Sequence, residues 1–183
     1  MSRTYTVQGF ILKRINYCEA DKIITIFTRE KGKQVLLAKG IRKICSRRAG
    51  CLELFNHTKM MVAKGKGMDI VCDTQLDCCY PAFSQDYHKT QIAYQIIELV
   101  DKMTREEQRE EEVYDLLHKA FQYLQKTKLD KAKKNKVLLR FKLRLLDILG
   151  FGYPEQINLP SLKLYIEDII ERKLVASKSF AMD

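Results

Sequence analysis

Residues 32–55 have the sequence GKQVLLAKGIRKICSRRAGCLELF, in which a hydrophobic strand is followed by a basic loop and then by a second strand. Gly40 and Gly50 stand at the ends of the loop and give its backbone freedom to turn. Between positions 31 and 48 there is no acidic residue, and there are seven basic ones: Lys31, Lys33, Lys39, Arg42, Lys43, Arg47 and Arg48. This imbalance predicts an anionic partner.

Short strands are expected on both sides of this loop. Stretches rich in β-branched and aromatic residues, several with alternating polarity, occupy residues 5–15, 22–28, 33–38, 52–63 and 68–79. The first three and the last two are separated by short polar or glycine-containing turns, which favours antiparallel pairing. Five antiparallel strands in about 75 residues, with the longest insertion between the third and fourth, are typical of an OB-fold barrel.

The hydrophobic period changes from two to about 3.6 after Tyr80 and Pro81. Helices are expected at residues 83–103, with Ser84 as a candidate N-cap, at 113–124 after a solvated charged turn (105–112), at 137–149 after a basic connector (127–136), and at 161–174. The sequence thus predicts an α+β protein: an N-terminal five-stranded antiparallel OB-fold barrel in residues 1–80, followed by an α-helical partner-docking domain in residues 81–183.

The positive charge is unevenly distributed along the chain. The net charge is +10 over 183 residues, and residues 1–80 hold 15 Lys and Arg against 7 Asp and Glu. The remaining residues hold 18 against 16. A charge that served solubility alone would be spread more evenly, so the first half is expected to bind the anion.

A phosphate backbone is the anion that suits this pattern best, because lysine and arginine can follow its regularly spaced charges without reading sequence. The simpler alternative is a solvated charge run with no partner. The residues predicted to bind nucleic acid are the seven basic ones above together with Arg14, Lys64 and Lys66. Among the aromatic residues, Tyr17 in a polar loop is the best candidate for stacking on a base, whereas Phe10, Phe27 and Phe55 are expected in the core.

The six cysteines form no CxxC pair and no paired histidines accompany them, so neither a metal site nor a cofactor is expected. The N-terminus lacks the apolar run of a signal peptide, and no stretch approaches a membrane span of about 18 apolar residues. We therefore expect reduced, mostly buried cysteines in a cytoplasmic protein that does not contact membranes.

Catalysis finds little support in the sequence. Asp69, Asp73 and Asp77 are spaced too far apart along a strand for one metal ion, and we interpret them as outward-facing charges. Gly65 and Gly67 do not form a phosphate-binding loop of the GxxxxGK[ST] type. No nucleophile with a neighbouring base is visible, so the chain is not expected to be an enzyme.

A resemblance to a known family lies in the order and spacing of short segments between residues 5 and 153. These are Gly9-Phe10-Ile11-Leu12, residues 19–28 (EADKIITIFT), Gly32-Lys33, Ala38-Lys39-Gly40 with Ser46, Gly50-Cys51-Leu52 before Phe55, Ala93-Tyr94, Glu98-Leu99, and residues 139–146 (LRFKLRLL) ending in Gly150-Phe151-Gly152. Together they resemble RecO, the bacterial recombination mediator family.

This resemblance implies an OB-fold followed by helices, binding of single- and double-stranded DNA, and annealing of complementary strands near the nucleoid. It also implies cooperation with RecR in loading RecA onto DNA coated by single-stranded DNA-binding protein (SSB), whose acidic, apolar C-terminal tail docks on the helical domain. Arg140 matches the arginine of the family's docking segment. Arg140, Lys142 and Arg144 alternate with apolar residues here, and a tail of acidic and aromatic residues needs cations beside an apolar groove. The simpler alternative is that Arg140 is a solvated helix residue that docks no partner.

The sequence departs from the family in three respects. It has no cysteine after Cys79, so the four-cysteine zinc module of many members is not expected. Lys142 stands where the family usually has glutamate, and only about 30 residues follow Gly152, which predicts a reduced helical domain. Two other functions stay open: an RNA-binding OB-fold protein with a helical interaction module, and a cysteine- or metal-dependent enzyme.

Overall fold

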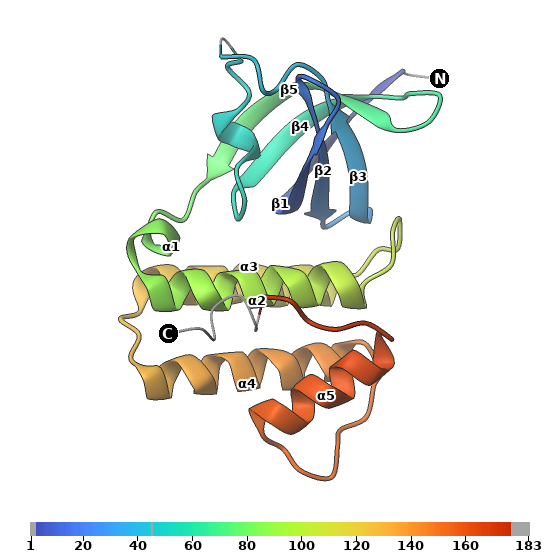
Figure 1. Ribbon diagram of the computed structural model, residues 1–183. Helices are drawn as coiled ribbons and strands as arrows, with labels where there is room; N and C mark the ends of the chain where they lie inside the picture. The colour runs from blue at the N-terminus through green and yellow to red at the C-terminus, as the bar shows by residue number, and fades with distance from the viewer. Residues whose placement is uncertain (1–2, 45, 177–183) are drawn as a thin grey trace. The chain divides into compact units, whose positions relative to one another are not determined.

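The computed structural model describes residues 3–44 and 46–176, which divide into two compact units (Figure 1). The first unit contains the chain up to Cys79 together with Thr104–Glu111, and the second contains Tyr80–Met103 and the residues after Glu111. The five strands lie in the first unit and the longer helices in the second. The expected α+β class is confirmed.

The strands of the first unit curl into a closed barrel with the order β1-β2-β3-β5-β4 (Figure 1). This order, with the longest connection between the third and fourth strands, is that of an OB-fold, as the sequence predicts. The strands are β1 (Thr4–Tyr17), β2 (Asp21–Thr28), β3 (Gly32–Ala38), β4 (His57–Ala63) and β5 (Asp69–Cys78).

One pairing in the barrel is not antiparallel. β3 and β5 run parallel and pair at only two positions, Leu36 with Asp69 and Leu37 with Ile70. The other four pairings are antiparallel. A closed ring with an odd number of strands cannot alternate direction throughout, so one parallel seam is unavoidable. The expected antiparallel OB-fold barrel is confirmed, with this single parallel seam between β3 and β5.

Strand β1 closes the barrel by pairing with two partners in succession. Its first half pairs with β4 and its second half with β2, and Gly9 pairs with both. A Cβ at Gly9 would lie 2.1 Å from the carbonyl oxygen of Phe27, so only glycine allows the strands to approach this closely. The barrel interior is apolar, with Ile11, Ile24 and Met60 fully buried in it.

Strand β4 begins five residues later than the sequence suggests. Residues 52–56 were expected to be strand, but Gly50–Leu52 forms a short 3₁₀ helix, η1, and strand pairing starts at His57. Phe55 has a positive φ of 71°, which lies outside the extended conformation of regular strands. The loop between β3 and β4 is therefore longer than predicted.

The charged segment Thr104–Glu111 packs on the barrel through its backbone, while residues 105–109 are exposed, as the composition of a solvated turn predicts. The backbone N–H of Glu107 donates to the carbonyl oxygen of Lys33 at 2.9 Å, and Glu106 forms a parallel bridge with Lys33. A Cβ at Gly32 would lie 1.7 Å from the carbonyl oxygen of Gln108. The segment thereby covers part of β3 that β5 leaves unpaired.

The second unit contains the helices α1 (Ala82–Gln85), α2 (Tyr87–Met103), α3 (Glu111–Lys126), α4 (Lys131–Ile148) and α5 (Leu159–Ile169). The helix expected at residues 161–174 spans Leu159–Ile169 and so ends five residues earlier. Two further boundaries correct the sequence-based expectation. The helix expected at residues 83–103 is interrupted at Asp86, whose side chain accepts from the N–H of His88 at 2.9 Å. Ser84 is not an N-cap, because its hydroxyl donates to the Pro81 carbonyl from within α1.

The second correction concerns the basic connector, which is largely helical. Asp130 caps α4 by accepting from the N–H of Lys133 at 2.7 Å, so the helix starts six residues before residue 137. The helical period expected after Tyr80 fits the burial observed: Ile92, Ile96 and Phe121 are fully buried. Among the described helices, none combines the length and apolar character needed to cross a membrane.

The cysteines differ from the expectation that most are buried. Cys18, Cys72, Cys78 and Cys79 are exposed, and Cys51 is partly buried. Three of these lie on or just after β5, whose second half has a mostly exposed surface. Cys45 lies outside the described residues.

Candidate functional site

A groove of about 880 Å³ opens on the barrel between the β1–β2 turn and the β3–β4 loop. It is lined by Cys18, Glu19, Ala20, Asp21, Lys39, Gly40, Lys43, Ser46, Arg47 and Arg48. Four cations thus face the groove against two carboxylates. The side chains of Lys39, Lys43 and Arg47 form no hydrogen bond or ion pair with other described residues. They are available to an anion.

The loop that supplies these cations is tied to the neighbouring turn by its backbone. The N–H of Gly40 donates to Asp21 Oδ1 at 2.7 Å, and the N–H of Arg42 donates to the Ala20 carbonyl at 2.9 Å. Gly40 has a φ of +65°, which lets the chain turn directly after β3. The loop is consequently held in place beside the groove.

Arg48 serves this loop in a different way from its basic neighbours. Its guanidinium donates to three backbone carbonyls: Val71 at 2.7 Å, Cys72 at 3.2 Å and Lys39 at 2.7 Å. These bonds connect the loop to β5 and to the end of β3. Arg48 lines the groove, but most of its donors are engaged within the barrel, so its first role is to hold the loop.

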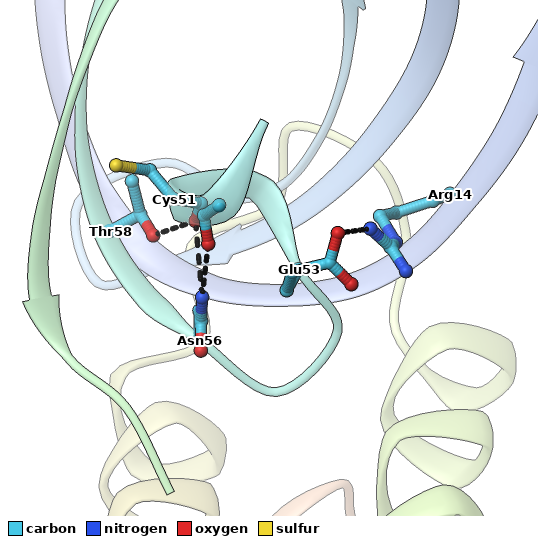
Figure 2. Close-up of polar contacts among 6 residues, drawn as sticks. Arg14, Cys51, Glu53, Asn56 and Thr58 are labelled. Carbon is cyan, nitrogen blue, oxygen red and sulfur yellow. Dashed lines mark hydrogen bonds and ion pairs between the residues drawn. The ribbon is translucent and has the colours of Figure 1, made fainter. Parts of the chain in front are cut away.

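The return of the loop into β4 is fixed by a second group of polar contacts (Figure 2). Asn56 Nδ2 donates to the Gly50 carbonyl at 2.9 Å, and the Thr58 hydroxyl donates to the Cys51 carbonyl at 2.6 Å. Arg14 of β1 forms an ion pair with Glu53. Since its side chain is only 19% exposed and already paired, Arg14 is better placed to support the loop than to bind DNA.

The remaining predicted residues do not join the groove. Lys31 Nζ lies 3.6 Å from the ring centroid of Tyr5, and Lys64 and Lys66 are exposed in the β4–β5 turn. Lys33 is only 9% exposed within β3. The continuous basic run of the sequence is thus divided by the fold. Lys39, Lys43 and Arg47 are exposed at the groove, and Arg42, which does not line it, is exposed and donates to the Cys18 carbonyl at 3.3 Å.

Apolar and aromatic side chains near the groove vary in exposure. Tyr17, the last residue of β1, is 42% exposed and Ile44 in the basic loop is fully exposed. Phe10 and Phe27 are completely buried, as expected for core residues, whereas Phe55 is only partly buried and the expectation for it is wrong. Tyr17 is therefore the stacking candidate that remains accessible.

The helical unit contains a second groove, of about 710 Å³, between α3 and α4. Its wall is largely apolar, with Leu116, Val137 and Phe141, and its cations are Lys119, Lys133, Lys136, Arg140 and Arg144. Lys136, Arg140 and Arg144 follow one another at intervals of four residues, which places them on one face of α4. The sequence analysis did not predict Lys119, Lys133 or Lys136 as groove residues. The four-residue interval between Lys136 and Arg140 was a signal that could have identified Lys136.

Two of the predicted docking residues are not free cations at the edge of this groove. Lys142 is only 3% exposed, and burial lowers its pKa to about 8. On a helix, a residue two positions from Arg140 points to the other side, so Lys142 does not line the groove. Arg144 lines it and forms an ion pair with Asp147 at 2.7 Å.

Two acidic residues of β5 contact side chains of other strands, and Asp73 is exposed. Asp77 lies 2.7 Å from His57 Nδ1, and Asp69 accepts from the Tyr5 hydroxyl at 2.6 Å. Within residues 3–44 and 46–176, no three His, Cys, Asp or Glu side chains gather in a way that could hold a metal ion.

Two family models match the chain. The model described as "Recombination protein O N terminal" matches residues 1–76, and the one described as "Recombination protein O C terminal" matches residues 84–155. The boundary between the two matches falls close to the start of the helices.

Similar proteins named "DNA repair protein RecO" come from several bacteria. One from Desulfatibacillum aliphaticivorans is 34% identical over 150 residues, covering 80% of this chain and 57% of the relative. One from Roseiflexus sp. (strain RS-1) is 33% identical over 149 residues, covering 81% and 51%. One from Symbiobacterium thermophilum is 31% identical over 147 residues, covering 80% and 57%. The chain spans somewhat more than half the length of these relatives.

Proposed function

Because this chain belongs to the RecO family, whose similar members are named DNA repair proteins, we propose that it is a repair and recombination mediator that binds single- and double-stranded DNA and anneals complementary strands. It acts by binding, without a catalytic step, and works in the cytoplasm at the nucleoid. The observation that carries the proposal is the barrel groove with its accessible cations.

The groove suits the backbone of a nucleic acid. Lys39, Lys43 and Arg47 present positive charge from a loop whose backbone is already tied to the barrel, so little ordering is needed on binding. Cations that neutralise phosphates on two strands reduce their mutual repulsion and allow them to pair. Annealing of this kind depends strongly on salt, because each neutralised phosphate releases a counterion.

We also propose that the helical unit docks the SSB tail, and the helical groove supports this. A peptide that combines carboxylates with an aromatic side chain needs an apolar floor and cations at its edge. Val137 and Phe141 supply such a floor, and Arg140 stands exposed at its edge. We place Lys136 and Arg144 beside Arg140 in this role and leave Lys142 out.

Cooperation with RecR and loading of RecA complete the proposal. They rest on family membership alone, and we assign no residue to either contact. DNA bound at the barrel and SSB bound at the helices would bring this chain to coated strands, where a recombinase must replace the coat.

The decisive experiment is annealing of complementary DNA strands, with and without an SSB coat, at two salt concentrations. Acceleration that decreases with salt and persists on coated strands supports both grooves. Acceleration on naked strands alone keeps the barrel site and removes the docking site. If neither occurs while matched RNA binds more tightly than DNA, the RNA-binding alternative replaces the proposal.

A further inference from the structure

A second cavity of the barrel unit, of about 330 Å³, lies beside the seam between β3 and β5. It is lined by Tyr5, residues 34–36 of β3, residues 67–69 at the start of β5, Glu106 and Glu107. The seam pairs only at residues 36–37 of β3, so the strand is not joined to β5 at Gln34, and space remains there. The segment Thr104–Glu111 adds its carboxylates to this space.

Tyr5 and Asp69 form a defined hydrogen-bonded pair in this cavity. The Tyr5 hydroxyl donates to Asp69 Oδ2 at 2.6 Å, and this bond lowers the pKa of Asp69, which is therefore ionised at neutral pH. Burial raises the pKa of Tyr5 to about 12, so the phenol keeps its proton. That single proton is committed to Asp69.

Gln34 has an acceptor that the described chain does not satisfy. Its Nε2 lies 3.5 Å from the Tyr5 hydroxyl oxygen, which can only accept because its proton is given to Asp69. This fixes the orientation of the amide. The residue is 7% exposed, and its Oε1 is buried with no hydrogen-bond partner among the described residues. A buried acceptor left in this state favours a ligand that donates.

The charged groups around the cavity are also acceptors. Glu106 and Glu107 have exposed side chains, and the backbone of Glu107 is fixed by its bond to Lys33. With Asp69, whose two oxygens accept from the Tyr5 hydroxyl and the Gly65 N–H, they give three carboxylates. Lys31 and Lys64 lie close enough to Asp69 to lower its pKa, but neither lines the cavity.

We propose that this cavity binds a guanidinium group, supplied as an arginine side chain by a partner peptide. A guanidinium carries five N–H donors in a plane, so it can serve the Gln34 oxygen and the carboxylates together, and it is more easily dehydrated than an ammonium group. The volume admits one side chain, and its carboxylates repel phosphate. The site is independent of the DNA groove and of the function proposed for it.

The first test uses N-acetyl-arginine amide as the probe and follows ¹⁵N–¹H spectra of the full chain. Saturable shifts at the Gln34 side-chain amide and the Glu107 N–H are expected. The uncharged isostere N-acetyl-citrulline amide should bind at least tenfold more weakly. Equal binding of the two probes, or shifts elsewhere in the chain only, overturns the proposal.

The second test compares two variants that lose the same charge. Glu106→Gln/Glu107→Gln removes both exposed carboxylates of the cavity, and Glu110→Gln/Glu112→Gln removes two from nearby positions that do not line it. The first pair should weaken arginine binding about tenfold, and the second should leave it within twofold; the reverse result, or no change in either, overturns the site. Binding of the peptide Gly-Gly-Arg-Gly-Gly supports a protein partner, and binding of free guanidinium alone contradicts it.

Discussion

The barrel and the helical unit each place cations beside a hollow, but the two hollows differ in what surrounds the charge. In the barrel groove the cations stand on a loop, next to backbone and two carboxylates. In the helical groove most of them stand on one face of α4, with Lys119 on α3, around an apolar floor that contains Val137 and Phe141. The first arrangement suits a long chain of regularly spaced charges, and the second suits a short peptide with both acidic and apolar groups.

The largest effect is expected from reversing the charges of the barrel loop. The triple variant Arg42→Glu/Lys43→Glu/Arg47→Glu should weaken DNA binding at least about 100-fold at low salt, because it replaces attraction to several phosphates by repulsion. Fluorescence anisotropy with labelled single and double strands measures this.

A matched control is Lys126→Glu/Lys128→Glu/Arg172→Glu, which reverses three exposed cations outside both grooves. Its DNA affinity should change far less. Unchanged affinity in the loop variant, with its circular dichroism spectrum intact, would move the DNA site to another face of the barrel.

Arg48 separates support of the loop from contact with DNA. Arg48→Met removes three charge-assisted bonds to backbone carbonyls and should lower the free energy of unfolding by about 2–3 kcal/mol. The neighbouring Arg47→Met, whose side chain makes no such bond, should change it by less than about 0.5 kcal/mol. Urea denaturation of the two variants measures the difference. Equal free energies of unfolding would show that the bonds from Arg48 to the three carbonyls contribute nothing to stability.

Lys142 tests whether this lysine belongs to the core or to the groove of the helical unit. Its pKa is lowered to about 8 by burial, so the unfolded chain binds more protons above that pH, and stability should rise by about 2 kcal/mol between pH 8 and 10. Lys142→Met should abolish this rise. The window lies below the range in which Tyr5, with its pKa raised to about 12, affects stability. Urea denaturation at each pH measures the free energy of unfolding. If this free energy changes with pH equally in the parent and in Lys142→Met, Lys142 is not buried as described.

The smallest effect is expected from Arg140→Ala at the helical groove. It should weaken binding of a peptide with the SSB-tail sequence about tenfold, or about 1.4 kcal/mol, while DNA affinity stays unchanged. Arg172→Ala serves as the control, because this exposed arginine does not line the groove. Calorimetry on the three proteins measures the difference, and equal affinities would remove Arg140 from the docking site.

The barrel could be predicted from the sequence because each strand is rich in β-branched and aromatic residues. In addition, the longest insertion lies between the third and fourth strands, which is typical of an OB-fold. The helical site was predicted less well, since alternation of Arg140, Lys142 and Arg144 with apolar residues is a strand criterion. On α4, residues four apart share a face, which brings in Lys136 and sends Lys142 into the core.

Other features depend on contacts between residues distant in the sequence. Arg48 and Arg47 are adjacent and chemically identical, yet only one of them reaches the carbonyls of β5. Similarly, the acidic composition of Thr104–Glu111 gives no sign that its backbone adds to the edge of β3. The role of such a side chain or segment can be assigned only when the positions of the neighbouring strands are known.

The short seam between β3 and β5 also bears on the order in which the barrel assembles. The hairpins of β1–β2 and β2–β3 join residues near in the chain, whereas the seam joins Leu36 to Asp69 and gains only two residue pairs for closing that long loop. We therefore expect it to form last and to open first. Over the lifetime of the native state, the barrel would behave as a curled sheet whose two edges repeatedly part and meet again.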